Sequence, residues 1–522
     1  MSPQPICRKE QRIVSSSHTT KSVRASVRHS LVAALATALS ACAIHPQPFT
    51  DAQATKDAQT GRAEMTGQQE AVAGPITLDE AMARAIHYNL DHRVKMMEEA
   101  LAQKQLDLSN FDLLPKLTTA AGYTARDHLL ASRSVGLANG STTVPPSYSS
   151  EKTDRTYDVG FSWNLLDFGV SYYEAKEASD QVLLVEQRRR KVIQLMMQQV
   201  REAYWEAAGA QRLHDKIEPL LQQARAALND SKQAQQEQLR TPLQALNYQR
   251  ELLEIMRQLE VVRGHLNEAK PRLASLMDIE PGSSFTLAPE EGFAMPDFQM
   301  PIDQMEETAL EHRPDLLEAR YSERISVNEG HKALAKLLPG IELSVGTHYD
   351  SNDFLTYNTW QDAGLRVSWN LLNLLNAGNI RHTAAAQLAV AHEQRLALTM
   401  AVLTQVHVAR SDLDAKRHEF DLMHQLSDID QQILQHTHNA AQANAEGKLE
   451  EIRAATGAMI SELRVYETYG ELQGAYGNLL ATLGLDPVPE NVKGHDLASL
   501  EQAIAKERQH WSALAQVGGK AQ

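Results

Sequence analysis

The side chains best suited to metal chemistry are four histidines that lie close together in one long polar stretch: His418, His424, His436 and His438. A zinc ion needs ligand atoms that converge on it from about 2 Å away. His436 and His438 are two positions apart, so on a helix they point about 200° from each other and do not easily share an ion. The sequence also lacks the HExxH, P-loop and GxSxG motifs and a cysteine nucleophile. We therefore predict no metal site, no cofactor and no enzymatic activity.

Cys42 is the residue whose surroundings point to a covalent modification. Residues 1–41 contain six basic side chains and one acidic side chain, and they end in an apolar run. A basic region followed by a short apolar core is typical of an export signal. The end of that run resembles a bacterial lipobox, which implies cleavage before Cys42, lipid on its thiol and, with Ala43 next, sorting to the outer membrane. We predict a signal peptide at 1–41 and a flexible tether at 42–75; the alternative is an ordinary buried cysteine.

Charge and hydropathy limit the partners of the remaining chain. Loss of residues 1–41 changes the formal net charge from -15 to -20, because six bases and one acid leave. An acidic chain is a poor ligand for nucleic acid, so we predict no nucleic-acid partner. Past the signal, no segment approaches the run of about 18 apolar residues that a membrane-spanning helix needs. A chain of this kind crosses a bilayer only with strands.

The sequence repeats itself in two halves. Pro115 and Pro339, each preceded by a leucine, lie 224 positions apart, and the Trp-Asn-Leu-Leu runs that begin at Trp163 and Trp369 lie 206 positions apart. The offset falls by 224 − 206 = 18 residues between these two landmarks, which places the extra residues in a single loop of the first half. Self-similarity over such a distance indicates a structural duplication.

Each half carries the same predicted elements: a helix that ends at Leu-Pro, two strands joined by a polar loop, then a long helix and a returning helix. The returning helix of the first half has the 3-4 apolar spacing of a coiled coil from Leu252 to Leu276. The predicted fold is mainly α with a small β part. Its boundaries are 76–300 for the first repeat (strands about 115–127 and 156–166, helices about 170–238 and 242–278), 301–487 for the second (strands about 339–350 and 363–372, helices about 375–446 and 449–484), and 488–522 for a C-terminal segment.

The predicted strands require partners from other chains. Each has about ten residues, the length of a tilted membrane strand. Four strands cannot close a barrel, and an open sheet edge in lipid leaves backbone groups unpaired at several kcal/mol each. Three copies would supply twelve strands above a hollow cylinder of helices. Asp158 and Arg366 interrupt the apolar alternation, so we expect them to face a lumen or a subunit contact.

The order of these elements resembles the TolC-like outer-membrane efflux proteins over about residues 76–487. Asp167-Phe168-Gly169 after the first Trp strand and Arg313-Pro314-Asp315-Leu316 at the start of the second half also match that family. The resemblance implies a lipid-anchored homotrimer in the outer membrane, with a 12-stranded β-barrel continued by a periplasmic α-helical barrel.

It further implies the duct of a tripartite export system, for efflux or type I secretion. Such a duct takes substrates from an inner-membrane transporter and a periplasmic adaptor, the membrane fusion protein. The run Leu480–Pro487 departs from the aromatic-rich ending of the lipidated drug-efflux branch, so export in general is favoured over multidrug efflux.

The resemblance also assigns roles to the turns between the long helices. Thr241 and Pro242 supply an N-cap and a first-turn proline for one returning helix. Gly447 and Leu449 mark the corresponding turn of the second half. These two tips are the implied docking points for the adaptor.

Family members can carry an aspartate pair that rings the periplasmic entrance near the second turn. The nearest residues here are Glu450, Glu451 and Arg453. If both carboxylates face the axis, three copies attract cations and hold the mouth shut unless Arg453 bridges them. The alternative is a solvated turn.

A different class of protein would share several of these features. A lipid-anchored periplasmic coiled-coil adaptor or scaffold without a pore would explain the anchor and the heptads equally well. It would not explain two hairpins of membrane length, which favour the duct.

Overall fold

A computed structural model describes residues 46–517 except 68, 134, 136, 139, 141–144, 238–240, 281, 289–291, 297, 444–446 and 488–495. The chain divides into two compact units, residues 1–68 and 69–522. Cys42 and the predicted signal peptide lie outside the described residues.

The first unit contains helix α2 (Asp51–Thr66), where the sequence predicts a flexible tether. The helix covers 16 residues of that segment and was not predicted. The side chain of Thr50 caps the helix by accepting a hydrogen bond from the N–H of Gln53. The side-chain oxygen of Gln53 in turn accepts a hydrogen bond from the N–H of Thr50 at 3.0 Å. The segment has no apolar stripe and lies almost wholly exposed, so local capping and helix-forming residues, not burial, specify it.

The second unit carries the elements of the first predicted repeat in the expected order. They are α3 (Leu78–Tyr88), α4 (Leu90–Phe111), β1 (Lys116–Ala125), the short pair β2 (Ala131–Ser132) and β3 (Ser147–Tyr148), β4 (Thr153–Asn164), α5 (Leu165–Gln236) and α6 (Pro242–Leu276). Asn164 ends β4 and starts α5 at once, because its side chain accepts a hydrogen bond from the N–H of Leu166 at 3.0 Å. The helix therefore begins before the predicted position 170.

The second half follows with α7 (Ile302–His312), α8 (Pro314–Ala335), β5 (Gly340–Asp350), β6 (Thr359–Ser368), α9 (Leu371–Leu375), α10 (Ala377–Gln442), α11 (Lys448–Thr482) and, beyond the repeat, α12 (Leu497–Val517). Strand β6 ends before Trp369, whereas Trp163 lies inside β4. The indole N–H of Trp369 instead donates to the carbonyl of Leu337 at 3.0 Å, which ties the end of β6 to the turn that follows α8.

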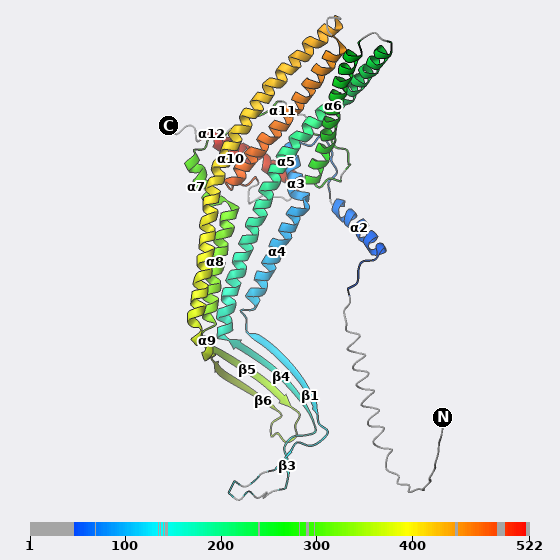
Figure 1. The fold of residues 1–522 in the computed structure, drawn as a ribbon. Helices are drawn as coiled ribbons and strands as arrows, with labels where there is room; N and C mark the ends of the chain where they lie inside the picture. The colour runs from blue at the N-terminus through cyan, green and yellow to red at the C-terminus, as the bar shows by residue number, and fades with distance from the viewer. Residues whose placement is uncertain are drawn as a thin grey trace, which may run out of the picture. The chain divides into compact units, whose positions relative to one another are not determined.

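The long helices pack side by side in two layers that follow one another along the helix axes (Figure 1). Helices α5 and α10 belong to both layers. Next to the sheet the order is α4, α5, α8, α10; away from the sheet it is α6, α5, α11, α10. With 72 residues, α5 is about 110 Å long. Helix α5 continues through Pro219, and α6 continues through Pro271.

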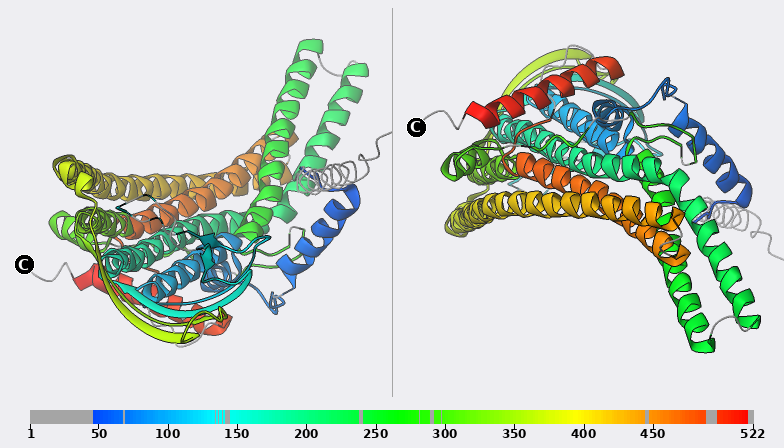
Figure 2. Two further views of the ribbon diagram at one scale, coloured as in Figure 1. Left: turned by 90° about the horizontal axis from the view of Figure 1, so that it is seen from below. Right: turned by 90° about the horizontal axis from the view of Figure 1, so that it is seen from above.

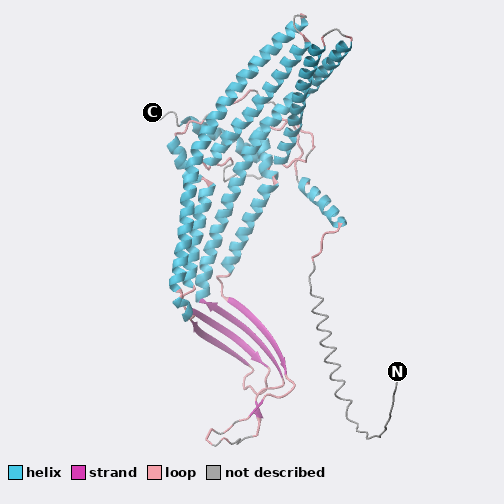
Figure 3. Cartoon of the chain, viewed as in Figure 1, coloured by secondary structure: helices cyan, strands magenta, loops and turns pink. Residues whose placement is uncertain are grey.

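The strands form one antiparallel sheet in the order β1-β4-β5-β6 (Figure 3). The two halves of the chain meet between β4 and β5, where Tyr157 lies opposite Tyr349 and Asp158 opposite His348. None of the described helices is apolar over a length sufficient to span a bilayer. The predicted class, mainly α with a small β part, is confirmed.

Candidate functional site

The sheet has one apolar face. Residues directly opposite each other in an antiparallel sheet share a face, so the register assigns every side chain. The odd-numbered positions of all four strands fall on one face, which carries exposed aliphatic side chains and an aromatic residue toward each end of the strands. Its larger apolar members are Leu117, Tyr123, Tyr157, Val159, Phe161, Trp163, Leu343, Val345, Tyr349, Leu365 and Val367. An exposed apolar band with aromatic girdles is the pattern of strands that face lipid.

The opposite face is polar and carries its charges in pairs. His348 of β5 contacts Asp158 of β4 (Nδ1 to Oδ1, 2.6 Å) and Asp362 of β6 (Nε2 to Oδ1, 3.3 Å). Arg366 lies 3.7 Å from the carboxylate of Glu342. Asp158 and Arg366, the two exceptions to the sequence alternation, therefore share this polar face. Their partners were missed because only the register between strands brings them together.

Both outer strands of the sheet leave one backbone edge without a partner. Within the described residues, β1 pairs only with β4 and β6 pairs only with β5. Unpaired N–H and C=O groups along a whole strand are a template for another strand. The protomer thus offers two such templates, one at each side of the sheet.

The outer helices of the two layers also expose apolar stripes. On α4 the stripe has spacings of 4, 3, 4, 7 and 3 residues, which match a coiled-coil seam with one position unfilled: Leu90, Val94, Met97, Leu101, Leu108 and Phe111. On α10 it consists of Leu422, Leu426, Ile429 and Ile433, and on α6 of Leu243, Leu246, Leu253 and Val261. Because α10 lies at one side of both layers and α4 and α6 at the other, two apolar edges face away from each other.

The tips of the two helical pairs lie at the turns that the sequence indicates. Thr241 accepts a hydrogen bond from the N–H of Gln244 at 3.4 Å, and Pro242 begins α6. Gly447 is the N-cap of α11, and Leu449 packs partly buried against the core. The residues between each pair of helices, 238–240 and 444–446, are not described.

The predicted gate residues are engaged in ion pairs within one protomer. Arg453 contacts Glu450 at 2.5 Å and also contacts Glu251 of α6. These two carboxylates raise the pKa of the Arg453 guanidinium. Glu251 was not identified from the sequence, since it lies in the other half of the chain.

Glu451 has partners of its own. Its carboxylate accepts from Nδ1 of His438 on α10 at 2.8 Å and lies 3.6 Å from the ammonium of Lys448. His438, considered above as a metal ligand, thus joins α10 to α11. In the described part of the chain, no three His, Cys, Asp or Glu side chains are placed to hold a metal ion.

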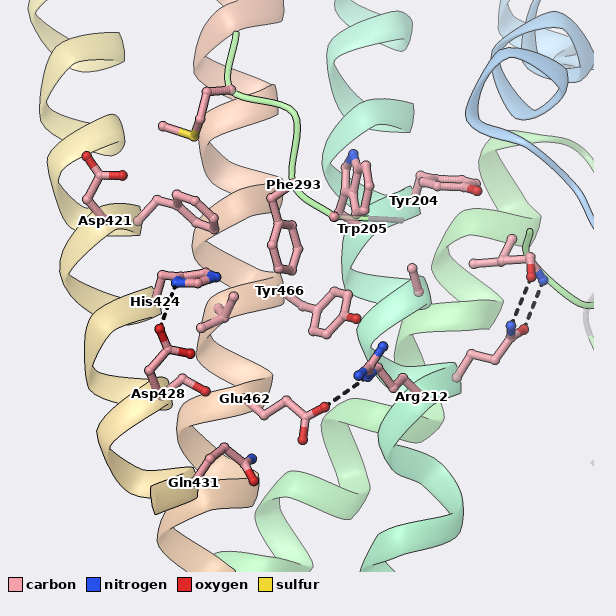
Figure 4. Close-up of a pocket in the computed structure, with 18 of the residues that line it drawn as sticks. Tyr204, Trp205, Arg212, Phe293, Asp421, His424, Asp428, Gln431, Glu462 and Tyr466 are labelled. Atoms are coloured by element: carbon pink, nitrogen blue, oxygen red, sulfur yellow. Dashed lines mark hydrogen bonds and ion pairs between the residues drawn. The ribbon is translucent and has the colours of Figure 1, made fainter. Parts of the chain in front are cut away.

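A cavity of about 970 Å³ lies between α5, α10, α11 and the segment that leads to α7 (Figure 4). Trp205, Phe293 and Tyr466 form its aromatic wall, with ring centroids of Phe293 and Tyr466 5.3 Å apart. Glu462 pairs with Arg212 at 2.9 Å and with Lys216 at 2.8 Å. These charges are mutually satisfied, and Phe293 anchors the connecting segment to the helices.

Comparison with known proteins agrees with this arrangement. The fold is that of outer-membrane channels: the Campylobacter jejuni CmeC outer membrane channel aligns with a TM-score of 0.61 at 12% identity, over 90% of this chain and 97% of that one. The Vibrio cholerae outer membrane protein VceC aligns at 0.57 with 16% identity, over 78% and 96%. The Neisseria gonorrhoeae MtrE outer membrane channel aligns at 0.56 with 16% identity, over 78% and 89%.

A family model matches part of the sequence. Residues 83–277 match the family model described as Outer membrane efflux protein. No curated protein matches the chain. The predicted resemblance to the TolC-like outer-membrane efflux proteins is confirmed, and the proteins that the chain resembles are channels rather than enzymes.

Proposed function

We propose that three copies of this chain form an export duct in the outer membrane. The observation that carries the proposal is the pair of opposite edges, one made by β1, α4 and α6 and the other by β6 and α10. Each edge combines an unpaired strand with an exposed apolar helix stripe. Such an edge is stable only when another chain covers it.

The two edges differ, so the contact between copies is head to tail. A head-to-tail contact builds a ring when its rotation closes. In the proposed trimer, β6 of one copy pairs with β1 of the next, and α10 packs against α4 and α6. Three four-stranded sheets then supply the twelve strands of a closed barrel, and the helices continue it as a tube.

The two faces of the sheet support this orientation. The apolar face with its aromatic girdles would meet lipid, and the face with Asp158, His348 and Asp362 would line the water-filled interior. A lumen explains why charged side chains occupy three neighbouring strands without exposure to hydrocarbon.

The anchor and the domain boundaries complete the proposal. Cleavage of the signal peptide before Cys42 would leave a lipid on its thiol, and residues 42–75, including α2, would link this anchor to the duct. The two repeats, 76–300 and 301–487, would each contribute one hairpin and one helical pair. The helices would extend into the periplasm.

The partners would bind at the end of the tube away from the membrane. We propose that a periplasmic adaptor docks at the tips around Thr241, Pro242, Gly447 and Leu449 and connects the duct to an inner-membrane transporter. Thr241, Pro242 and Gly447 are exposed, and helices α6 and α11 begin at the end of the helices away from the sheet (Figure 1). The chain would thus pass substrates to the exterior by efflux or type I secretion.

The carboxylates near the second tip would control ion passage. In this proposal Glu450 and Glu451 lie at the entrance, and Arg453 and His438 hold them in position. Alanine at both glutamates removes two negative charges per copy and should lower the cation preference measured as a reversal potential in a KCl gradient. Glu254→Ala, an exposed glutamate farther along α6, is the matched control. An unchanged cation preference would favour the solvated turn.

A periplasmic scaffold without a pore is the second candidate. It accounts for the lipid anchor and the long helices, but leaves the exposed apolar sheet face without a role. The sheet therefore favours the duct.

The decisive measurement is the native mass of the protein extracted from outer membranes in mild detergent. We expect a trimer. Ile429→Glu places a charge on the α10 stripe, where the native side chain is 54% exposed, and should shift the mass toward the monomer. Gln435→Glu adds the same charge off the stripe and should leave the trimer intact. A stable wild-type monomer in the soluble fraction would overturn the duct and favour the scaffold.

A further inference from the structure

Figure 2 shows that the long helices form two hairpins, α5 with α6 and α10 with α11, each with its own tip. A side-chain contact crosses each hairpin at a corresponding place. In the first, the amide of Gln249 donates to the side-chain oxygen of Gln235 at 2.8 Å, across 14 positions. In the second, Nδ1 of His438 lies 2.8 Å from Oε1 of Glu451, across 13 positions. The first contact joins neutral amides, whereas both members of the second are ionisable.

His438 continues the buried face of α10. The buried residues of this helix recur at intervals of three, four and seven: Val402, Val406, Ala409, Leu413, Phe420 and Ser427. His438 lies eleven positions beyond Ser427, which is about three turns of helix and returns to the same face. Within the described residues 428–442 of this helix, none is buried. The contact with Glu451 therefore lies where the burial of α10 has ended.

Glu451 has few partners. Its side chain is 18% exposed, while that of His438 is 51% exposed. In the described part of the chain, the only other cation that pairs with its carboxylate is Lys448 of the same helix, at 3.6 Å. The second ring nitrogen of His438, Nε2, lies 2.9 Å from the amide nitrogen of Gln442. His438 is thus the group that joins this carboxylate to α10.

The remaining charged side chains in the first turns of α11 have partners of their own. Glu450 pairs with Arg453 at 2.5 Å, and Arg453 also pairs with Glu251 of α6. These groups compensate one another and leave the carboxylate of Glu451 to His438 and Lys448. The charge of His438 therefore changes how strongly α10 is held to α11 at the tip.

The contact has two protonation states. In the neutral imidazole with its proton on Nδ1, that N–H donates to Glu451, and Nε2 accepts from the amide of Gln442. A protonated imidazole donates from both nitrogens, so the amide of Gln442 turns its oxygen toward Nε2. The added proton also creates an ion pair with the carboxylate, and Coulomb attraction strengthens the contact. Because histidine ordinarily changes charge between pH 5 and 8, the contact is stronger at the acid end of this range and weaker at the alkaline end.

We propose that His438 and Glu451 form a proton-operated latch at the tip of α10 and α11. The latch is closed when His438 is protonated and loosened when it is neutral. The amide contact between Gln235 and Gln249 holds the other tip equally at both ends of this pH range. In the duct described above, the entrance lies at the tip of α10 and α11, so a rise in pH loosens the entrance; this consequence rests on the proposed function.

Hydrogen exchange of the full-length, detergent-extracted protein tests the latch within a protomer. Exchange is followed by mass spectrometry at about pH 5.5 and about pH 7.5, and each rate is corrected for the intrinsic rate at that pH. Peptides from residues 430–455 should open about two to five times more often at the higher pH, the range of a partly exposed ion pair. Peptides from residues 230–255 contain no histidine and should show no such change. An equal change at both tips, or none at either, would overturn the latch.

Single substitutions separate the charge of His438 from its bulk. His438→Gln keeps a neutral hydrogen-bonding side chain and should exchange at the faster rate at both pH values. His438→Lys keeps a cation at both pH values and should exchange at the slower rate. His436→Gln, two positions away on a different face of α10, is the matched control and should retain the pH dependence of the wild type. A wild-type dependence on pH in His438→Gln would contradict the latch.

The corresponding tip allows the converse test. Gln235→His together with Gln249→Glu places an ionisable pair at the contact between α5 and α6. Peptides from residues 230–255 should then acquire a pH dependence of the same sign as that of the second tip. If this double variant keeps the melting temperature of the wild type but exchanges equally at both pH values, the pair is not a switch and the latch is excluded.

Failure of the latch and failure of the duct give different results. A trimer by native mass whose two tips exchange equally at both pH values would remove the latch and leave the duct. A monomer with a pH-dependent second tip would remove the duct and leave the latch. When both hold, the current through the reconstituted trimer should be larger at the higher pH, and His438→Lys should abolish this difference. Equal currents of the wild type at both pH values would show that the latch does not control the entrance.

Discussion

The two long helices α5 and α10 hold equivalent places in the two halves of the sequence but very different places in the protomer. Of 72 residues in α5, 24 are buried, whereas α10 buries 6 of 66. Helix α5 lies in the interior of both layers, between α4 or α6 on one side and α8 or α11 on the other, and α10 lies at their edge. Equivalent sequence positions therefore do not have equivalent environments. A helix at the edge keeps its apolar stripe for another chain.

The largest expected effect is the loss of a buried leucine from the central helix. Leu213 of α5 is fully buried, and Leu213→Ala should lower the free energy of unfolding by about 2–5 kcal/mol. Ile429→Ala on α10 removes a similar side chain from an exposed stripe and should change protomer stability by less than about 0.5 kcal/mol. Urea unfolding followed by tryptophan fluorescence measures both.

The same pair separates protomer stability from association. Ile429→Ala should still weaken the trimer, which native mass at decreasing protein concentration detects. If both variants lowered protomer stability equally, the stripe would be part of the core of a single chain and the comparison would fail.

Glycine substitutions test the same contrast between α5 and α10, with smaller expected changes in stability. A Cβ added at Gly209 of α5 would lie 2.5 Å from Cβ of Tyr466 on α11, which is closer than real contacts allow. Gly209→Ala should therefore destabilise the fold by about 1–3 kcal/mol. Gly378 at the start of α10 has no atom within 4 Å of that position, so Gly378→Ala should stabilise by about 0.5–1 kcal/mol through the unfolded state. Thermal melting of the two variants in parallel checks the opposite signs, and a gain from Gly209→Ala would show that the two helices can separate.

Two glutamates where α5 and α11 pack together predict that the stability of the fold depends on pH. Burial, with repulsion from Glu206 and Glu471, raises the pKa of Glu202, and burial likewise raises the pKa of Glu467. A carboxylate with a raised pKa in the fold binds its proton more tightly there than in the unfolded chain. Its contribution to stability is therefore lost as the pH rises from about 4.3, the ordinary glutamate value, through the higher folded value.

Glu202→Gln and Glu467→Gln remove this penalty. Each should raise the urea midpoint at pH 7 and reduce the difference between midpoints at pH 5 and pH 7. Glu393→Gln, at an exposed glutamate of α10, controls for the loss of one negative charge at the edge helix. A pH profile identical to that of the wild type in both α5 and α11 variants would exclude these carboxylates as its source.

Much of this fold could be predicted from the sequence because its patterns are local. The Leu-Pro breaks, the strand lengths and the heptads from Leu252 to Leu276 depend on nearby residues, and the helices and strands lie close to the predicted boundaries. Two features were not predicted, because the periodicity of the sequence carries little information about them. Helix α2 has no apolar period, and Asn164 starts α5 early through a single capping bond.

The site was harder to predict because its partners are distant in the chain. His348 bridges three strands, and Glu251 reaches Arg453 across 202 positions. Only the register of the sheet and the packing of the helices bring these groups together. Composition and spacing identified one member of each pair and could not identify the other.

The smallest expected effect concerns the contact between the two helical pairs near their tips. Arg453 and Glu251 are both partly exposed, so their ion pair should contribute at most about 1 kcal/mol. A double-mutant cycle with Glu251→Ala and Arg453→Ala isolates this coupling from the separate pair of Arg453 with Glu450. The coupling should shrink further in 1 M salt, where screening is nearly complete. A coupling above about 2 kcal/mol that resists salt would mean that the tips are held together as firmly as the central helix, and that the edge helix pair is not free to move independently of α5 and α6.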